Sequence, residues 1–110
     1  MICVDLYFEK DILYRFRLDG HAGYAEAGSD IVCAGVSTLV INTINSVEEL
    51  TDEPLSMNTV DSKNGVIDCN FPNRKRNQLD SKATVLLDSM ILGLKSIKQM
   101  YGEYIIINTK

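Results

Sequence analysis

The sequence predicts an α+β fold with the element order ββαββαβ, in which two helices pack on one face of a mainly antiparallel sheet. Two observations lead to this class. Apolar residues alternate at every second position near the amino terminus, which is typical of strands, and they recur every three or four positions in two longer segments, which is typical of helices. The chain has 110 residues, the usual size of one domain, so we expect a single domain over residues 1–110.

The first two strands are expected at residues 2–8 and 12–18. The apolar residues expected on their inner face are Ile2, Val4, Leu6 and Phe8 in the first strand and Ile12, Tyr14, Phe16 and Leu18 in the second. The link at residues 9–11 is short, which favours an antiparallel hairpin.

A helix is expected from Ile31, where the apolar spacing changes to three and four. Its stripe consists of Val32, Val36, Leu39, Val40, Thr43, Ile44 and Val47. Asp30 is a suitable N-cap, because its carboxylate can accept hydrogen bonds from the unpaired N–H groups of the first turn. We expect the helix to end near residues 48–50, before the proline-containing stretch at 51–54.

A second hairpin is expected from residues 55–61 and 66–71. Between them, Asn64-Gly65 favours the left-handed backbone conformation of a tight turn. The first arm of this hairpin is polar, so we expect it at an edge of the sheet.

A second helix follows, with Asn77 as its N-cap and Gly102 at its end. Its apolar stripe consists of Leu79, Ala83, Leu86, Leu87, Met90, Ile91, Leu94, Ile97 and Tyr101. Residues 104–108 are expected to form the last strand, which their apolar run predicts to be buried.

The composition is that of an ordinary globular protein, with 45% hydrophobic and 24% charged residues. The net charge of −4 and the pI near 4.8 argue against a protein held to nucleic acid by phosphate contacts. The charge is uneven, since residues 21–70 carry eight acidic residues and one basic residue, whereas residues 71–110 carry seven basic and three acidic residues. The basic end could meet RNA or an acidic surface, but four of its charges lie on an expected helix, where we expect a solvated face and no direct contact with nucleic acid. The acidic residues at 48–53 fit either a solvated helix end or a surface for a basic part of a substrate.

Three cysteines, Cys3, Cys33 and Cys69, form no Cys-x-x-Cys pair. An odd number without paired spacing predicts neither a disulfide framework nor a zinc site, and it favours a reducing compartment. No basic leader precedes the first strand, and the uncharged run at 31–47 is short and contains six polar residues. We therefore expect a cytoplasmic protein that does not insert in a membrane and holds no metal.

The connection between the second strand and the first helix is the unusual segment of the chain. It is longer than most connections of this kind, and it contains Gly20, Gly23 and Gly28, which predict a mobile loop or lid. The only histidine, His21, begins this loop, and Cys33 follows it in the expected first turn of the helix. A helix N-terminus favours an anion, and a nearby imidazole can accept a thiol proton, so the two residues could form a nucleophilic pair. The spacing alone favours the simpler interpretation, a core cysteine and a solvated histidine.

The residues of this segment resemble the signature of the bacterial ribosomal-processing cysteine protease family. The resemblance rests on Gly20–Tyr24 (GHAGY) and Gly28–Ser37 (GSDIVCAGVS), on their separation and on the serine that ends the second block. It extends along the chain in length and element order. Gly35 departs from the pattern, in which an alanine is expected.

The resemblance implies a homodimeric cytoplasmic cysteine endopeptidase that needs no metal or cofactor. Members of the family remove an N-terminal extension from the precursor of the large-subunit ribosomal protein L-twenty-seven during ribosome assembly. By position, Cys33 would be the nucleophile, and His21 the general base and later the acid. Asp30 and Ser37 would support the site, Asp30 as a cap and loop anchor and Ser37 from the next turn of the helix.

Two other functions are compatible with parts of the pattern. A non-catalytic module for ribosome assembly would explain the uneven charge, although it gives no reason for His21 and Cys33 to occur together in a glycine-rich segment. A thiol redox sensor would pair Cys33 with Cys3 or Cys69, but their positions in strands favour roles in the core.

Overall fold

The computed structural model describes residues 1–20, 27–61 and 63–110. Its elements are β1 (Ile2–Glu9), β2 (Ile12–Asp19), α1 (Ala27–Leu50), β3 (Ser56–Asp61), β4 (Val66–Asn70), α2 (Pro72–Lys75), α3 (Ser81–Met100) and β5 (Ile105–Thr109). The five strands form one sheet in the order β3-β4-β2-β1-β5. All neighbouring strands are antiparallel except β1 and β5, which are parallel.

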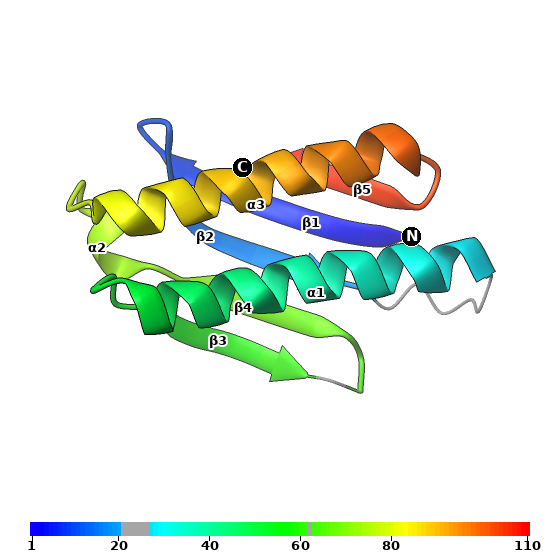
Figure 1. Cartoon of the computed structure of the whole chain (residues 1–110), viewed down its shortest axis with the longest axis horizontal. Coiled ribbons are helices and arrows are strands. Elements are labelled where there is room, and N and C mark those ends of the chain that lie inside the picture. Colours follow the sequence, from blue (N-terminus) through cyan, green and yellow to red (C-terminus); the bar gives the residue numbers. More distant parts are fainter. Residues whose placement is uncertain (21–26, 62) are drawn as a thin grey trace.

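The long helices α1 and α3 lie side by side on one face of this sheet (Figure 1). This arrangement confirms the predicted α+β class and its two helices on a mainly antiparallel sheet. The short helix α2 was not predicted. It forms around Arg74, whose buried guanidinium donates to the Leu13 carbonyl at 2.6 Å and to Thr84 Oγ1 at 2.8 Å.

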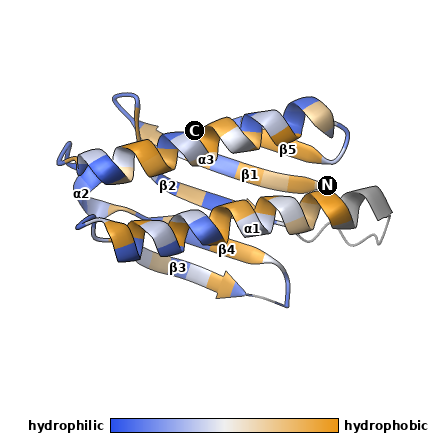
Figure 2. Ribbon diagram, viewed as in Figure 1, coloured by the Kyte–Doolittle hydropathy of each residue, from blue (hydrophilic) through white to orange (hydrophobic). Residues whose placement is uncertain are grey.

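The core lies between the sheet and the two helices, where the apolar stripes of both helices meet the inner face of the strands (Figure 2). The helices approach closely at Gly93 of α3, because a Cβ atom there would lie 2.8 Å from Leu39 Cδ2 of α1. Residues 31–50 of α1 are long and apolar enough to cross a membrane by composition, but the buried part of this segment forms the apolar stripe on the sheet.

Two of the core positions predicted in β2, Ile12 and Tyr14, are wrong. The register shifts between Tyr7 and Phe8, so that Tyr7 pairs with Arg15 and Phe8 pairs with Leu13. This β-bulge places an extra residue in β2 and reverses the alternation. Leu13 therefore takes the buried position predicted for Tyr14, and the Tyr14 ring lies 6.4 Å from that of Tyr7.

The outer face of the sheet carries a polar cluster around Asp68, whose side chain is only 3% exposed. Arg15 donates two hydrogen bonds to the Asp68 carboxylate, at 2.9 and 2.7 Å, and Asn58 donates a third at 3.3 Å. The hydrogen bonds from Arg15 hold the pKa of Asp68 below its usual value, although burial opposes this shift. The carboxylate is therefore a fixed part of the outer face.

The predicted start of the second helix is also wrong. Asp80, not Asn77, is the N-cap of α3, and its carboxylate accepts from the Ala83 N–H at 3.0 Å. Asn77 instead has a left-handed backbone, with φ of 62°, in the turn after α2. The helix ends at Met100 with Tyr101 as C-cap, directly before Gly102 as expected.

The two edges of the sheet are β3 and β5. The polar strand β3 is at an edge, as predicted, and Gly65 in the turn that follows has a φ of 68°. The last strand is the other edge, and Ile105 is its one fully buried residue, so the prediction of a buried strand is wrong. Only one face of this edge strand meets the helices, so Ile106 on its other face is exposed although it belongs to the apolar run.

Candidate active site

The candidate site lies at the amino-terminal part of α1, which begins earlier than predicted. The helix starts at Ala27, so Asp30 is its fourth residue and not its N-cap, and Cys33 is its seventh residue. The apolar stripe begins only after the first turn, and for this reason the spacing placed the helix start too late. Cys33 lies in the second turn, beyond the unpaired N–H groups of the helix end. The dipole effect is confined to the first turn, so activation of this sulfur depends on its neighbours.

The Cys33 side chain contacts two of the other predicted site residues. Its Sγ atom donates to the Gly20 carbonyl at 3.3 Å, and it lies 4.0 Å from Ser37 Oγ, one helical turn further along. The side chain is half-buried, packed against the edge of the core. A thiolate has no proton to donate, so ionisation of Cys33 removes the hydrogen bond to Gly20 and leaves the sulfur free to move.

Gly20 is anchored and is not part of a loose loop. It is buried directly after β2, and its N–H donates to the Gly65 carbonyl at 2.8 Å. A Cβ atom on Gly20 would lie 3.1 Å from Cys33 Sγ, tighter than most contacts of this kind, so the absence of a side chain lets the sulfur approach the strand end. Gly28, also predicted in the loop, is the second residue of α1.

His21 and Gly23 lie outside the described residues. Their predicted roles, as general base and as part of a lid, therefore stay predictions. Among the described residues, no three His, Cys, Asp or Glu side chains gather closely enough to hold a metal ion.

The other two cysteines differ from Cys33 in their surroundings. Cys69 is fully buried on the inner face of β4, and this burial raises its pKa to about 12, which keeps the thiol protonated and unreactive. Cys3 alternates with the buried Ile2 and Val4 and so lies on the outer face of the sheet, away from α1. Neither is placed to act as a disulfide partner of Cys33.

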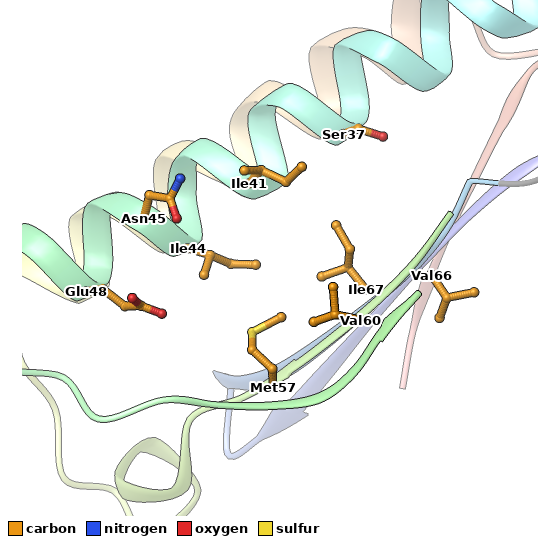
Figure 3. A pocket seen from close by; sticks show the side chains of 9 residues that line it. All are labelled: Ser37, Ile41, Ile44, Asn45, Glu48, Met57, Val60, Val66 and Ile67. Carbon is orange, nitrogen blue, oxygen red and sulfur yellow. The ribbon is translucent and has the colours of Figure 1, made fainter. Parts of the chain in front are cut away.

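A hollow of about 490 Å³ begins at Ser37 and follows α1 toward its carboxyl-terminal end. Figure 3 shows side chains of α1 on one side of it and side chains of β3 and β4 on the other. Its described lining consists of Ser37, Ile41, Ile44, Asn45, Glu48, Met57, Val60, Val66 and Ile67. The sequence pattern did not predict this hollow. The available signal was the pair of apolar residues Met57 and Val60 in an edge strand that otherwise reads as polar.

Comparison with known proteins places this geometry in a family. The family model described as "Cysteine protease Prp" matches residues 1–106. The ribosomal processing cysteine protease Prp of Bacillus subtilis is 34% identical over 102 residues, which cover 92% of this chain and 88% of the relative. Its counterpart in Staphylococcus aureus is 34% identical over 93 residues, which cover 84% of this chain and 83% of the relative.

Solved structures agree with the sequence comparison. The crystal structure of the essential ribosomal processing protease Prp from Staphylococcus aureus, in complex with a substrate peptide, superposes with a TM-score of 0.87 at 29% identity over the whole of both chains. A crystal structure from Streptococcus mutans superposes with a TM-score of 0.84 at 33% identity, over 99% of this chain and 93% of that one. The predicted resemblance is confirmed, and it favours an enzyme over a non-catalytic module. The chain belongs to the Prp family of ribosomal-processing cysteine proteases.

Proposed function

We propose that this protease uses Cys33 as its nucleophile and His21 as its general base to remove the N-terminal extension of the ribosomal protein L-twenty-seven precursor. The observation that carries the assignment is the position of Cys33, which is half-exposed beside Ser37 and Gly20, while Cys69 is sealed in the core. Of the three thiols, Cys33 is the one whose sulfur lies 4.0 Å from Ser37 Oγ, and Ser37 lines a hollow of suitable size for a peptide.

The covalent chain supports His21 as the base. The carbonyl of Gly20 accepts from Cys33 Sγ, and His21 is the next residue, joined to that carbonyl carbon by the peptide bond. This bond limits how far the imidazole can lie from the sulfur, although twelve positions separate the two residues in sequence. Ionisation of Cys33 by His21 would give a thiolate beside an imidazolium.

The reaction follows from these two groups. The Cys33 thiolate adds to the scissile carbonyl carbon, and the carbonyl oxygen takes the negative charge. As the tetrahedral intermediate collapses, the C–N bond breaks and the His21 imidazolium gives its proton to the leaving amine. A water, deprotonated by His21, then hydrolyses the thioester and releases the peptide acid and the free thiol. Ser37 Oγ would steady the thiolate by donating a hydrogen bond, and its distance of 4.0 Å from the sulfur supports this role.

The dyad is tested with Cys33→Ala, His21→Ala and the matched control Cys3→Ala. We expect Cys33→Ala to keep the fold and to lose at least about 10³-fold in kcat/KM on a peptide that spans the processing junction. We expect His21→Ala to lose a similar factor and to slow the alkylation of Cys33 by iodoacetamide at neutral pH. Mass spectrometry of the L-twenty-seven precursor after incubation with each variant identifies the cleaved bond.

Two outcomes would contradict the assignment. Cleavage by Cys33→Ala at the rate of Cys3→Ala would exclude Cys33 as the nucleophile. An unchanged pH profile of alkylation in His21→Ala would exclude the ion pair, even where cleavage is lost.

The family resemblance also supports a homodimer that acts in the cytoplasm, and Asp30, three residues before Cys33, as a residue that orders the site. Native mass spectrometry of the purified chain tests the dimer. A monomer at micromolar concentration that retains full activity would exclude a functional role for dimer formation.

A further inference from the structure

We propose that a pocket between the β1–β2 turn and the end of α2 binds a phosphate group through Lys10, Lys75, Arg76 and the buried Arg74. This basic pocket has a volume of about 220 Å³. The β1–β2 turn and α2 lie at one end of the molecule, whereas the amino-terminal turns of α1, which carry Cys33, lie at the other end (Figure 1). The inference goes beyond the proposed function and does not depend on it, because none of the four cations belongs to the proposed dyad.

Two left-handed turns bring the cations of the basic pocket together. Lys10 and Asp11 have φ of 51° and 66°, and they form the two-residue turn that joins β1 to β2. Asn77, with φ of 62°, reverses the chain after α2, and its N–H donates to the Arg74 carbonyl at 3.0 Å. Lys10 and Arg74 therefore line the same pocket, although they are far apart in sequence.

Arg74 is a buried cation whose charge is only partly balanced by its neighbours. It is 3% exposed, and its guanidinium donates to two neutral acceptors, the Leu13 carbonyl and Thr84 Oγ1. Glu53 forms an ion pair with it at 3.9 Å, which is too long for a hydrogen bond, and Glu53 Oε1 has no hydrogen-bond partner among the described residues. A buried charge is costly unless a counter-charge also forms hydrogen bonds with it. An anion in the pocket that Arg74 lines would supply such a counter-charge.

The other three cations of the basic pocket are exposed, so they are available to a ligand. They are Lys10, Lys75 and Arg76. Lys75 Nζ lies 5.1 Å from the centre of the Tyr14 ring, a contact that holds the ammonium beside β2. Arginine and lysine form charge-assisted hydrogen bonds with phosphate oxygens, and arginine can do so with two N–H groups at once.

The charge and the size of the basic pocket both favour a compact anion. Among its described lining residues, four are basic and Glu9 is the one acidic residue. The basic residues are in excess even when Glu53 is counted against Arg74, although the whole chain has a net charge of −4. The volume is below the range of about 300–1,000 Å³ that is typical of pockets for small organic ligands. The pocket therefore fits a phosphate group better than a complete nucleoside.

The site is tested by titration of the isotope-labelled chain with sodium pyrophosphate at constant ionic strength, followed by two-dimensional amide NMR. We expect the resonances of residues 9–12 and 74–77 to shift together in one saturable transition. The Nε–H of Arg74, which is held 2.6 Å from the Leu13 carbonyl, is expected to shift with them. A shift of the exposed cations without one of this Nε–H would overturn the part of the buried cation in the site.

Charge reversal tests which cations hold the ligand. The variants are Lys10→Glu and Arg76→Glu, and the matched control is Lys95→Glu, which makes the same change in charge at an exposed position of α3. We expect the Kd for pyrophosphate to rise at least about tenfold in each pocket variant and to stay within about twofold in the control. An equal rise in all three variants would overturn the site, because binding would then depend on net charge alone.

Two sources could supply the phosphate group, a free oligophosphate and the backbone of RNA. A short single-stranded oligouridylate, titrated in the same way, distinguishes them. Displacement of pyrophosphate from residues 9–12 and 74–77 by the oligonucleotide would assign the site to RNA. Binding of pyrophosphate that the oligonucleotide does not displace would assign the site to a free oligophosphate.

Failure of this inference differs from failure of the proposed function. No saturable shift of residues 9–12 and 74–77 with either ligand would overturn the phosphate site, whatever the activity of the chain. We expect Cys33→Ala to bind pyrophosphate with the Kd of the wild type, because the basic pocket lies at the other end of the molecule (Figure 1). Cleavage retained in Cys33→Ala would overturn the dyad and leave this site in place.

Discussion

The two long helices cover the same face of one sheet, yet they differ in what their flanks contact. α3 buries Ala83, Leu87, Met90 and Leu94 against the sheet and α1. α1 buries its own stripe in the same way, but the flank that carries Ser37, Ile41 and Glu48 faces a hollow beside β3. A sheet of five strands is wider than two helices side by side, and the part of it that the helices leave uncovered lies beside α1, at the edge strand β3 (Figure 1).

This difference separates stability from function along the two helices. We expect substitutions in the stripe of α3 to change the free energy of unfolding, because those side chains are buried in the core and are not among the described residues that line the hollow. We expect substitutions on the open flank of α1 to change substrate handling more than stability, because Ile41 and Glu48 are exposed there. Each of the following variants tests one side of this division.

Leu94→Ala is expected to have the largest effect on stability. Leu94 is fully buried in α3, and removal of its side chain should lower the free energy of unfolding by about 3 kcal/mol. Leu92→Ala, on the exposed side of the same helix, should change it by less than about 0.5 kcal/mol. Urea titration gives both values. A fall in kcat/KM per folded molecule in Leu94→Ala would show that α3 does take part in catalysis.

Gly20→Ala should reduce activity more than stability. The new Cβ atom would lie 3.1 Å from Cys33 Sγ, so the sulfur must shift, and we expect kcat/KM and the alkylation rate to fall roughly tenfold. The control is Gly35→Ala in α1, where an added Cβ meets nothing within 4 Å. That variant should gain about 0.5–1 kcal/mol in stability at unchanged activity, since alanine favours a helix over glycine. Equal kinetics in the two variants would contradict a role for the close contact at Gly20.

Substitution of Asp80 is expected to have the smallest effect on stability, and this effect should depend on pH. Its hydrogen bond from the Ala83 N–H lowers the pKa of its carboxyl, so the charged form stabilises α3 above the unfolded pKa of about 3.9. This stabilisation is lost as the pH falls through the lowered pKa. We expect the urea midpoint of Asp80→Ala to be lower than that of the wild type at pH 7 and to approach it at low pH. Asp80→Asn is expected to retain the cap at both pH values. A constant difference between Asp80→Ala and the wild type at all pH values would exclude the charge as the cause.

The sequence predicted the parts of the fold that depend on local periodicity. The stripes of α1 and α3, the edge position of β3 and the neighbourhood of Cys33 and Ser37 all follow from spacing along single elements. The errors arise where distant contacts decide. The bulge at Tyr14 depends on pairing with β1. No local pattern in the basic residues 74–76 indicates that the Arg74 guanidinium is buried and bound to Leu13 and Thr84.

The hollow between α1 and the β3–β4 hairpin was not predicted from the sequence for a similar reason. Its two sides, Ile41 on α1 and Val60 on β3, are far apart in sequence, and the apolar pair Met57 and Val60 in a polar strand does not by itself indicate which element lies opposite. The start of α1 was misplaced because a first helical turn without apolar residues carries no periodic signal.

The hydrogen bond from the Gly20 N–H to the Gly65 carbonyl has a mechanical consequence. It ties the tip of the β3–β4 hairpin to the same residue whose carbonyl accepts the hydrogen bond from Cys33 Sγ at 3.3 Å. A displacement of that tip must either break this 2.8 Å bond or pull Gly20, and with it the acceptor of the sulfur, in the same direction. A force on the outer hairpin is thus transmitted to the Cys33 side chain through two hydrogen bonds of one glycine.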